Sequence, residues 1–179
     1  MFDSIPKPGL FWSVVAAIVP TLAYVILIWR IDRYEKEPLK LLAAAFLWGA
    51  LLPAVLLSAA VEVAFDAPIV ALSRGYDRLV MSSLVAPPIE EALKALALLG
   101  LFLLARYEFD GVLDGIIYAS LIGFGFAMTE DIFYFGNVQG DLSAWSTIVL
   151  GRTLAFAFSH AMFTSFTGVG FGLASYLRS

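Results

Sequence analysis

The sequence predicts an all-α, multi-pass transmembrane bundle of about five spanning helices, on two observations. Of the 179 residues, 61% are hydrophobic and only 15% are charged, whereas soluble domains average about 45–50% apolar and about 25% charged residues. The apolar residues also form five runs, each long enough for a helix to cross a hydrocarbon core of about 30 Å. No alternating barrel pattern is present, and only helices otherwise satisfy backbone groups in lipid.

The spans follow one another with short connections. They are roughly 9–29, 40–64, 79–105, 112–137 and 147–177. Residues 106–111 are short enough to form a tight hairpin between the third and fourth spans. The length suits a single integral-membrane domain, residues 1–179. Because the last apolar run stops abruptly at Leu177-Arg178-Ser179, we expect either a chain that is truncated at its C-terminus or an unusually short member of its group.

Charge and composition limit the location and the partners. Lys and Arg favour the cytoplasmic side of a membrane, and their distribution predicts a cell-membrane protein with its N-terminus outside and its C-terminus inside. The regions then inside carry Arg30, Arg33, Lys36, Lys40, Arg106 and Arg178, and those outside carry Lys7, Arg74 and Arg78. The net charge is -4 and no basic patch predicts nucleic-acid binding, so membrane lipid is the expected surrounding. Cysteine is absent, which excludes disulfides and thiolate chemistry.

Three of the spans contain ionisable residues away from their ends, where such residues are costly in lipid. They are Glu90, Glu91 and Lys94 in the third span, Glu130 and Asp131 in the fourth, and Arg152 and His160 in the fifth. Each such group costs about 2.5–3.5 kcal/mol at mid-membrane on insertion scales, so by default it marks function. We therefore expect one polar site, assembled from three helices inside the bundle.

Spacing organises the charges of the third span. Lys94 follows Glu90 by four residues and Glu91 by three, so it can pair with either carboxylate on the helix surface. Two adjacent carboxylates sharing one lysine are typical of an acid and a base with separate roles, although an ion-paired helix interface would have the same spacing. Pro87-Pro88 should kink the helix just before them and open space for water.

Supporting residues are expected around this site. Tyr134 and Asn137 follow Glu130 by four and seven residues and therefore share its helix face. Arg152 could balance the excess of carboxylates, and Asp114 could equally be a structural residue that is solvated or paired with Arg106.

Small residues predict how the last two spans pack. Gly168 and Gly172 form one stripe with Thr164, and Ala119, Gly123 and Ala127 form another. Such stripes let two helix backbones approach closely in lipid. The two spans should therefore lie side by side, which brings Glu130 towards His160, and Thr164, one turn after His160, should orient its ring.

These residue types allow several functions. A glutamate that activates water, with a histidine that stabilises the oxyanion, would hydrolyse an amide bond. Glu91, Glu130 and His160 could instead bind one divalent metal such as zinc. Buried acids with a lysine and a histidine also suit a proton- or cation-coupled transporter, although no duplicated halves are visible. A non-catalytic membrane receptor of the same fold is the third alternative.

Several motifs resemble one known family. The motifs are Asp32–Pro38, Ala86–Lys94 (APPIEEALK), Glu108–Gly111, Asp114–Tyr118, Gly123–Glu130, and Arg152 with His160. In this order they resemble the PrsW family of intramembrane proteases, which is related to the CAAX-processing and bacteriocin-immunity membrane proteases. The resemblance covers nearly the whole chain. The main departure is Asp131, which adds a charge where such proteins commonly have asparagine.

The resemblance implies an intramembrane endopeptidase whose catalytic residues are Glu90, Glu91, Glu130 and His160. Lys94 and Arg152 would then tune the charge of the site, to which Asp131 adds a further charge. The implied substrate is a single-pass membrane protein similar to an anti-sigma factor, cut at a first site. The family is described both as glutamate-type and as metal-dependent, so either no cofactor or one divalent metal is expected. Because Glu130 and Arg152 lie near the outer ends of their spans, the cut should fall in the outer half of the bilayer.

Overall fold

The computed structural model describes residues 6–31, 36–51, 60, 63–64, 80–138 and 141–177. Its elements are α1 (Leu10–Ile31), α2 (Leu39–Ala50), a π-helical turn (Met81–Val85), α5 (Ala86–Leu104), α6 (Val112–Asn137), α7 (Leu142–Leu150), a second π-helical turn (Gly151–Ala155) and α8 (Ser159–Ser175). The described residues form no strand beyond an isolated bridge between Pro6 and Asp141. The predicted all-α class is confirmed.

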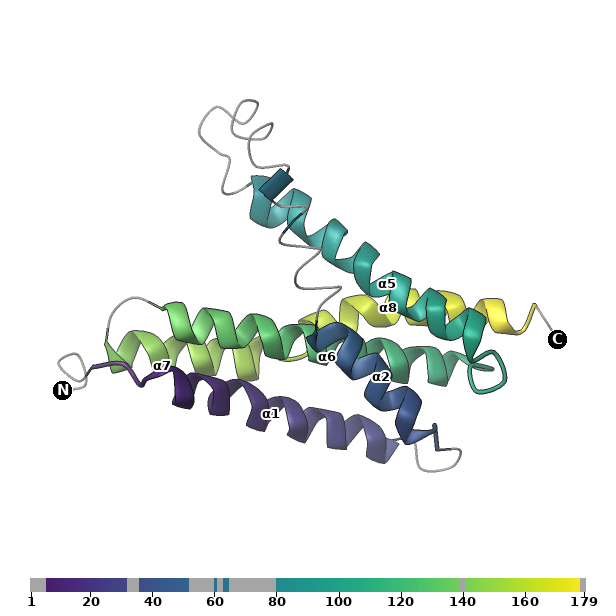
Figure 1. The fold of residues 1–179 in the computed structure, drawn as a ribbon, viewed down its shortest axis with the longest axis horizontal. Coiled ribbons are helices and arrows are strands. Elements are labelled where there is room, and N and C mark those ends of the chain that lie inside the picture. The colour runs from purple at the N-terminus through teal and green to yellow at the C-terminus, as the bar shows by residue number, and fades with distance from the viewer. Residues whose placement is uncertain are drawn as a thin grey trace.

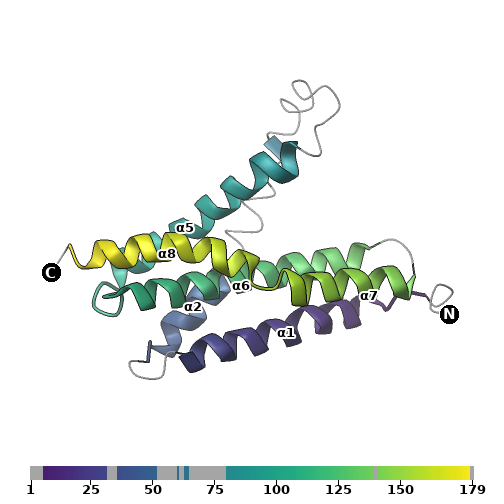
Figure 2. The ribbon, with the colours of Figure 1, turned by 180° about the vertical axis from the view of Figure 1, so that it is seen from behind.

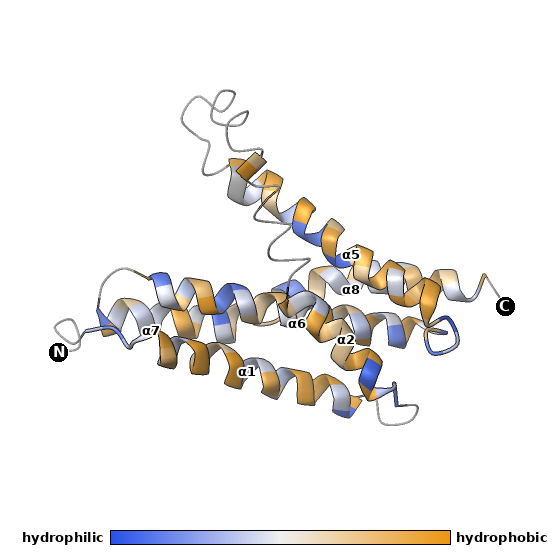
Figure 3. Cartoon of the chain, in the orientation of Figure 1, coloured by the Kyte–Doolittle hydropathy of each residue, from blue (hydrophilic) through white to orange (hydrophobic). Residues whose placement is uncertain are grey.

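Membrane-spanning character is strongest in three parts of the chain. These are α1, α6 and the α7–α8 unit Leu142–Ser175, all long and apolar enough to cross a bilayer. At 19 residues, α5 is about 28 Å long, but its charges lower its hydropathy (Figure 3). The second predicted span is represented by α2, and most of its remainder, 52–59 and 61–62, lies outside the described residues.

Helix α6 is the centre of the molecule. Its buried residues run from Ile117 to Ala127 without a break, because α8, α2 and α1 pack around it (Figures 1 and 2). Helix α5 lies against α8 towards its C-terminal end and diverges from the bundle towards its N-terminal end (Figures 1 and 2). In its first half, Lys94 and Glu91 are still in contact with α8, through His160 and Thr164.

Small residues allow the close contact of α6 with α8. A side chain on Gly168 would collide with the backbone of Gly115, and one on Gly115 would collide with Gly168. Similarly, Gly123 faces the backbone of Ala161. The predicted contact between these two helices is confirmed, and it places the start of α8 beside the middle of α6.

Polar groups also fix the N-terminal end of α6. The Asp114 carboxylate accepts hydrogen bonds from the backbone N–H groups of Asp110 (3.0 Å) and Gly111 (2.7 Å), and so caps the helix. One turn later, the fully buried Tyr118 donates a hydrogen bond to Glu37. The expected pairing of Asp114 with Arg106 is replaced by the cap, and Arg106 contacts Tyr107.

The last predicted span, roughly 147–177, corresponds to the candidate span Leu142–Ser175, but it starts earlier and is not one regular helix. Helix α7 already begins at Leu142, because the Asp141 side chain accepts hydrogen bonds from two N–H groups of its first turn. The π-helical turn then interrupts the span, and α8 starts only at Ser159.

The prolines 87 and 88 lie in the first turn of α5, directly after a π-helical turn, where a missing N–H is tolerated.

Some predictions concern residues outside those that the structure describes. They are the loop 66–78 with Arg74 and Arg78, most of the charged segment 32–38 including Arg33, and Arg178.

Candidate active site

Lys94 is the buried centre of the charges on α5. Its side chain is fully buried, and its ammonium lies 2.7 Å from Glu91 Oε1 and 3.9 Å from Glu90 Oε2. Both predicted pairings are therefore present, with Glu91 the closer partner. The two carboxylates keep 17% (Glu90) and 28% (Glu91) of their side-chain surface exposed, so a reactant can reach them while the lysine stays covered.

His160 joins this group to the rest of the site. The Lys94 ammonium lies 3.1 Å from His160 Nδ1, and His160 Nε2 lies 2.9 Å from Glu130 Oε2. An ammonium has only donors, so Nδ1 must accept and the ring proton belongs on Nε2, facing Glu130. This neutral tautomer presents an N–H group at the carboxylate. His160 is the second residue of α8, and the break after the π-helical turn places it there.

Arg152 completes the site from the π-helical turn. Its guanidinium donates to Glu130 Oε2 at 2.7 Å and, through Nε, to the Asp131 carboxylate. The Tyr134 ring lies against it, 4.1 Å from the guanidinium carbon. A planar guanidinium can bind two carboxylates at once, and this one fixes the two adjacent acids of α6.

These contacts form one continuous chain across three helices. It runs Glu91–Lys94–His160–Glu130–Arg152–Asp131, with Glu90 as a side branch on Lys94. With the histidine neutral, four carboxylates face two cations. Such an excess of negative charge can be neutralised by a shared proton or a bound cation. The structure thus brings together all four predicted catalytic residues and three of the four charged supporting ones, Lys94, Asp131 and Arg152.

Thr164 has a different place from the one expected. It was expected to orient the His160 ring, but its hydroxyl contacts Glu91 Oε2 (3.0 Å) and the His160 carbonyl (2.8 Å). Thr164 is fully buried, so it fixes the second oxygen of Glu91 from α8. The four-residue spacing between His160 and Thr164 indicated the contact with the His160 carbonyl. Nothing in the sequence indicated the contact with Glu91 of α5.

The aromatic residue Phe126 was also missed from sequence. Its ring centroid lies 4.0 Å from Lys94 Nζ and 5.3 Å from the centroid of the His160 ring. An ammonium over an aromatic face is stabilised by the ring quadrupole, so Phe126 helps to hold a lysine without water. The alternation of Gly and Phe around Phe126 reads as ordinary helix packing.

The remaining predicted residues lie further away. Asn137 is exposed, and its amide donates to the Phe133 carbonyl at 2.9 Å. Asp114 caps the opposite end of α6. Of the supporting residues, Tyr134 is thus the one uncharged member that touches the charge chain.

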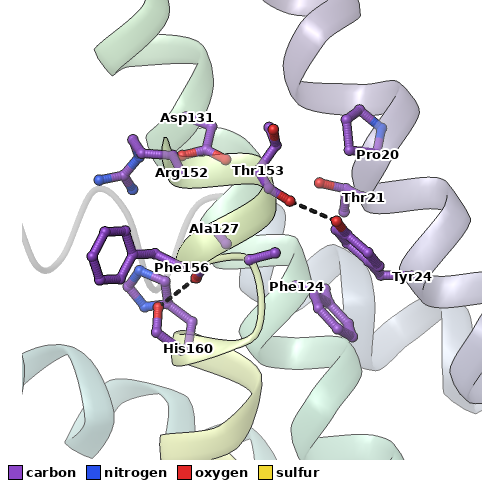
Figure 4. Close-up of a pocket in the computed structure, with 12 residues that line it drawn as sticks. Pro20, Thr21, Tyr24, Phe124, Ala127, Asp131, Arg152, Thr153, Phe156 and His160 are labelled. Carbon is purple, nitrogen blue, oxygen red and sulfur yellow. Dashed lines mark hydrogen bonds and ion pairs between the residues drawn. The ribbon is translucent and has the colours of Figure 1, made fainter. Parts of the chain in front are cut away.

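A cavity of about 210 Å³ adjoins the site between α1, α6 and the segment leading into α8 (Figure 4). Asp131, Arg152 and His160 line one part of it, and Tyr24 and Phe124 line another. The Tyr24 hydroxyl donates to the Thr153 carbonyl at 2.5 Å, which fastens α1 to the π-helical turn. The chain of charges therefore borders a space large enough for part of a reactant.

The predicted metal ligands do not fit a divalent ion as they are arranged. Both His160 nitrogens already face other side chains, and Lys94 stands between His160 and Glu91. Within the described part of the chain, no three His, Cys, Asp or Glu side chains converge in a way that could hold a metal. Binding by Glu91, Glu130 and His160 would require the ammonium to move out of their midst.

Comparison with known proteins identifies the family. The model described as "PrsW family intramembrane metalloprotease" matches residues 37–179. A "Protease PrsW" from Clostridioides difficile (strain 630) is 33% identical over 149 residues, which cover 82% of this chain and 59% of that protein. A "Protease PrsW" from Geobacillus kaustophilus (strain HTA426) is 28% identical over 176 residues, 93% of this chain and 68% of that protein.

The chain spans about three fifths to two thirds of the length of these relatives. No solved structure matches. The match over residues 37–179 includes every residue of the charge chain. The chain belongs to the PrsW family of intramembrane proteases.

Proposed function

We propose that this chain is an intramembrane endopeptidase that cuts membrane-anchored proteins with water activated by a glutamate. The observation that carries the proposal is the continuous contact from Glu91 to Glu130 through Lys94 and His160. It links two carboxylates to a neutral imidazole N–H group and to the ammonium of Lys94, and Arg152 binds Glu130 at the end of this link. Peptide hydrolysis needs a base for the water, a donor for the oxyanion and an acid for the leaving amine.

The two glutamates of α5 are the proposed bases. Glu91 is held by Lys94 through one oxygen and by Thr164 through the other, and it remains partly exposed, so it can accept a proton from a water molecule that approaches it. Glu90 lies beside it on the same ammonium at a longer distance. The proton taken from water is then available for the leaving amine.

His160 is the proposed donor for the carbonyl oxygen. Lys94 keeps Nδ1 as an acceptor, so the N–H group on Nε2 is available. In the absence of substrate it faces Glu130, and turning it towards a substrate carbonyl would stabilise the developing oxyanion. Glu130, with Arg152 on the same oxygen, would hold the attacking water on the other side.

The finer statements follow from the same site. Glu130 and Arg152 lie towards the end of α6 and the start of the α7–α8 unit, which is the outer half of the membrane if the N-terminus is outside. We propose that the cut falls there, in a single-pass membrane protein similar to an anti-sigma factor.

The test is cleavage of a tagged single-pass protein by the purified chain in lipid vesicles, beside Glu91→Gln. The variant should fold like the original and cleave at least about 100-fold more slowly, because general base catalysis contributes about 10²–10⁴-fold. Equal cleavage by both proteins would disprove the assigned base. Transport of protons or cations into the vesicles without cleavage would favour the transporter alternative, and substrate binding without cleavage would favour a receptor.

Metal dependence is tested in the same assay. Cleavage that survives a strong chelator would support the glutamate mechanism. Loss of cleavage on chelation, restored by zinc, would contradict it and give Glu91, Glu130 and His160 the role of ligands. Lys94→Met is assayed beside the original chain with and without the chelator, because it removes the ammonium that stands between His160 and Glu91.

A further inference from the structure

We infer that the cavity beside His160 is a specificity pocket that receives one apolar side chain next to the scissile bond. The inference rests on the proposed function, since it assigns the substrate class of the same site. It starts from the two unlike parts of the cavity wall. One part consists of Asp131, Arg152 and His160, and the other includes Tyr24, Phe124 and Ala127.

The apolar part of the cavity is rigid. Tyr24 packs against Phe124 (ring centroids 5.8 Å apart) and against Phe158 (4.8 Å), and Phe124 contacts Phe158 (5.4 Å). The rings come from α1, α6 and the start of α8, so each helix fixes the others. The tyrosine hydroxyl is also held by the Thr153 carbonyl. A wall of this kind selects by size, because it cannot move without separating helices.

The size of the cavity matches one side chain. An apolar protein cavity of about 150 Å³ is enough to hold benzene, so about 210 Å³ accepts a group as large as a phenyl ring. A whole helix would not fit. Two small residues, Ala127 from α6 and Ala157 from the segment before α8, also line the cavity and are almost fully buried.

The position of the cavity suits a residue beside the cut. His160, which we expect to polarise the scissile carbonyl, lines the cavity itself, and its Nδ1 faces away towards Lys94. A carbonyl bound at His160 would place a neighbouring side chain in the cavity. Phe156 also lines it and is 66% exposed, so the cavity lies close to the outer surface of the bundle, where a membrane-spanning substrate would arrive.

The inference predicts a preference for Leu or Phe over Ala at one of the two residues that flank the cut. Filling the pocket should reverse that preference. Ala127→Leu and Ala157→Leu fill it from two different elements, and each should change the ratio of Phe-substrate to Ala-substrate cleavage by at least about tenfold. A misfit of a few methylene groups in an apolar pocket has an effect of this order.

The experiment uses the full chain in lipid vesicles and a model single-pass substrate whose cut has been mapped by mass spectrometry. Ala, Leu and Phe are then placed in turn at each flanking position. The matched control is Ala23→Leu, which adds the same atoms to an exposed position of α1 next to Tyr24. A loss of structure would slow all substrates equally, so the ratio reports the pocket. An unchanged ratio in both filled variants, with cleavage intact, would overturn the inference and leave the proposed function standing.

A second measurement does not depend on cleavage. A photoreactive benzophenone amino acid at position 156 should crosslink to the substrate, and peptides with Phe at the flanking position should compete better than those with Ala. Ala127→Leu should abolish this difference. Size-selective crosslinking without cleavage would support the pocket and contradict the proposed function. Crosslinking that ignores side-chain size would overturn the inference.

Discussion

The two ends of α6 use carboxylates in different ways. At its start, Asp114 accepts two backbone N–H groups and Tyr118 donates to the buried Glu37. Near its end, Glu130 and Asp131 meet Arg152 and His160, and Glu130 keeps 25% of its side chain exposed. At the start of α6, every partner of a carboxylate named here is a backbone group or a neutral hydroxyl.

Under the proposed function, this difference separates a structural acid from a chemical one in an apolar helix. An acidic residue within a predicted span is costly at either end, so cost alone does not assign a role. The partners do. Backbone N–H groups and a tyrosine hydroxyl satisfy a carboxylate permanently, whereas an imidazole and a partly exposed arginine beside a cavity allow protons and reactants to be exchanged.

The sharpest test makes the same change at both ends. Glu130→Gln should reduce cleavage about 100-fold or more, because it removes the charge that faces His160 and Arg152. Glu37→Gln should leave the rate per folded molecule within about twofold and lower the melting temperature instead. The measurement is the cleavage rate and the melting curve of both variants in the same lipid. A large loss of cleavage for Glu37→Gln would contradict the distinction between the two ends of α6.

A smaller effect is expected from Arg152→Lys. The arginine binds two carboxylates through separate nitrogens, and a lysine cannot reproduce this planar geometry. Cleavage should fall about tenfold, with the fold retained. Lys40→Arg, an exchange at an exposed position of α2, is the control for changing a basic residue. Full activity of Arg152→Lys would show that charge alone, without geometry, is sufficient.

The contact between α6 and α8 should respond mainly in stability. Gly168→Ala places a methyl group against the backbone of Gly115, whereas Gly170→Ala, two residues on, meets nothing within 4 Å. Overpacking of this kind costs about 1–3 kcal/mol, or a fall of about 2–4 °C in melting temperature per kcal/mol. The Gly170 variant should melt at or slightly above the original temperature. Equal melting of both variants would contradict the close helix contact.

The smallest effect is expected at the cap of α6. Asp114→Ala removes the acceptor of two backbone N–H groups and should destabilise the protein by about 0.5–2 kcal/mol. Cleavage per folded molecule should not change, because the cap lies at the opposite end of α6 from Glu130. Asp114→Asn, which keeps one side-chain oxygen, should recover part of the stability. A specific loss of cleavage would instead make Asp114 part of the chemistry.

Much of the architecture could be predicted from the sequence. Apolar runs of sufficient length indicate spans in lipid whatever their partners, and the glycine stripes of α6 and α8 correctly indicated a close contact between those helices. The pairing of Lys94 with Glu91 follows from helical spacing alone. These are local properties, or properties of one repeated pattern.

The remaining features depend on contacts between distant segments. The interruption of the last span before His160 is not marked by proline, and its π-helical turn lies where Thr153 meets Tyr24 of α1. The bond from Thr164 to Glu91 joins α8 to α5, and no spacing rule relates the two. Glu37 belongs to the charged motif Asp32–Pro38, and nothing in that motif indicates that it is buried and accepts a hydrogen bond from Tyr118. Such contacts are set by how helices pack, which a single sequence does not encode locally.

The central claim is that the charge chain at the end of α6 works as one catalytic unit. A double-mutant cycle of cleavage rates with Glu91→Gln, Glu130→Gln and the two changes combined tests this directly, because residues that act together have strongly non-additive effects. We predict that the double variant is about as slow as the slower single variant. Losses that multiply, so that the double variant is slower by the product of the two, would show that Glu91 and Glu130 act independently and would contradict the account.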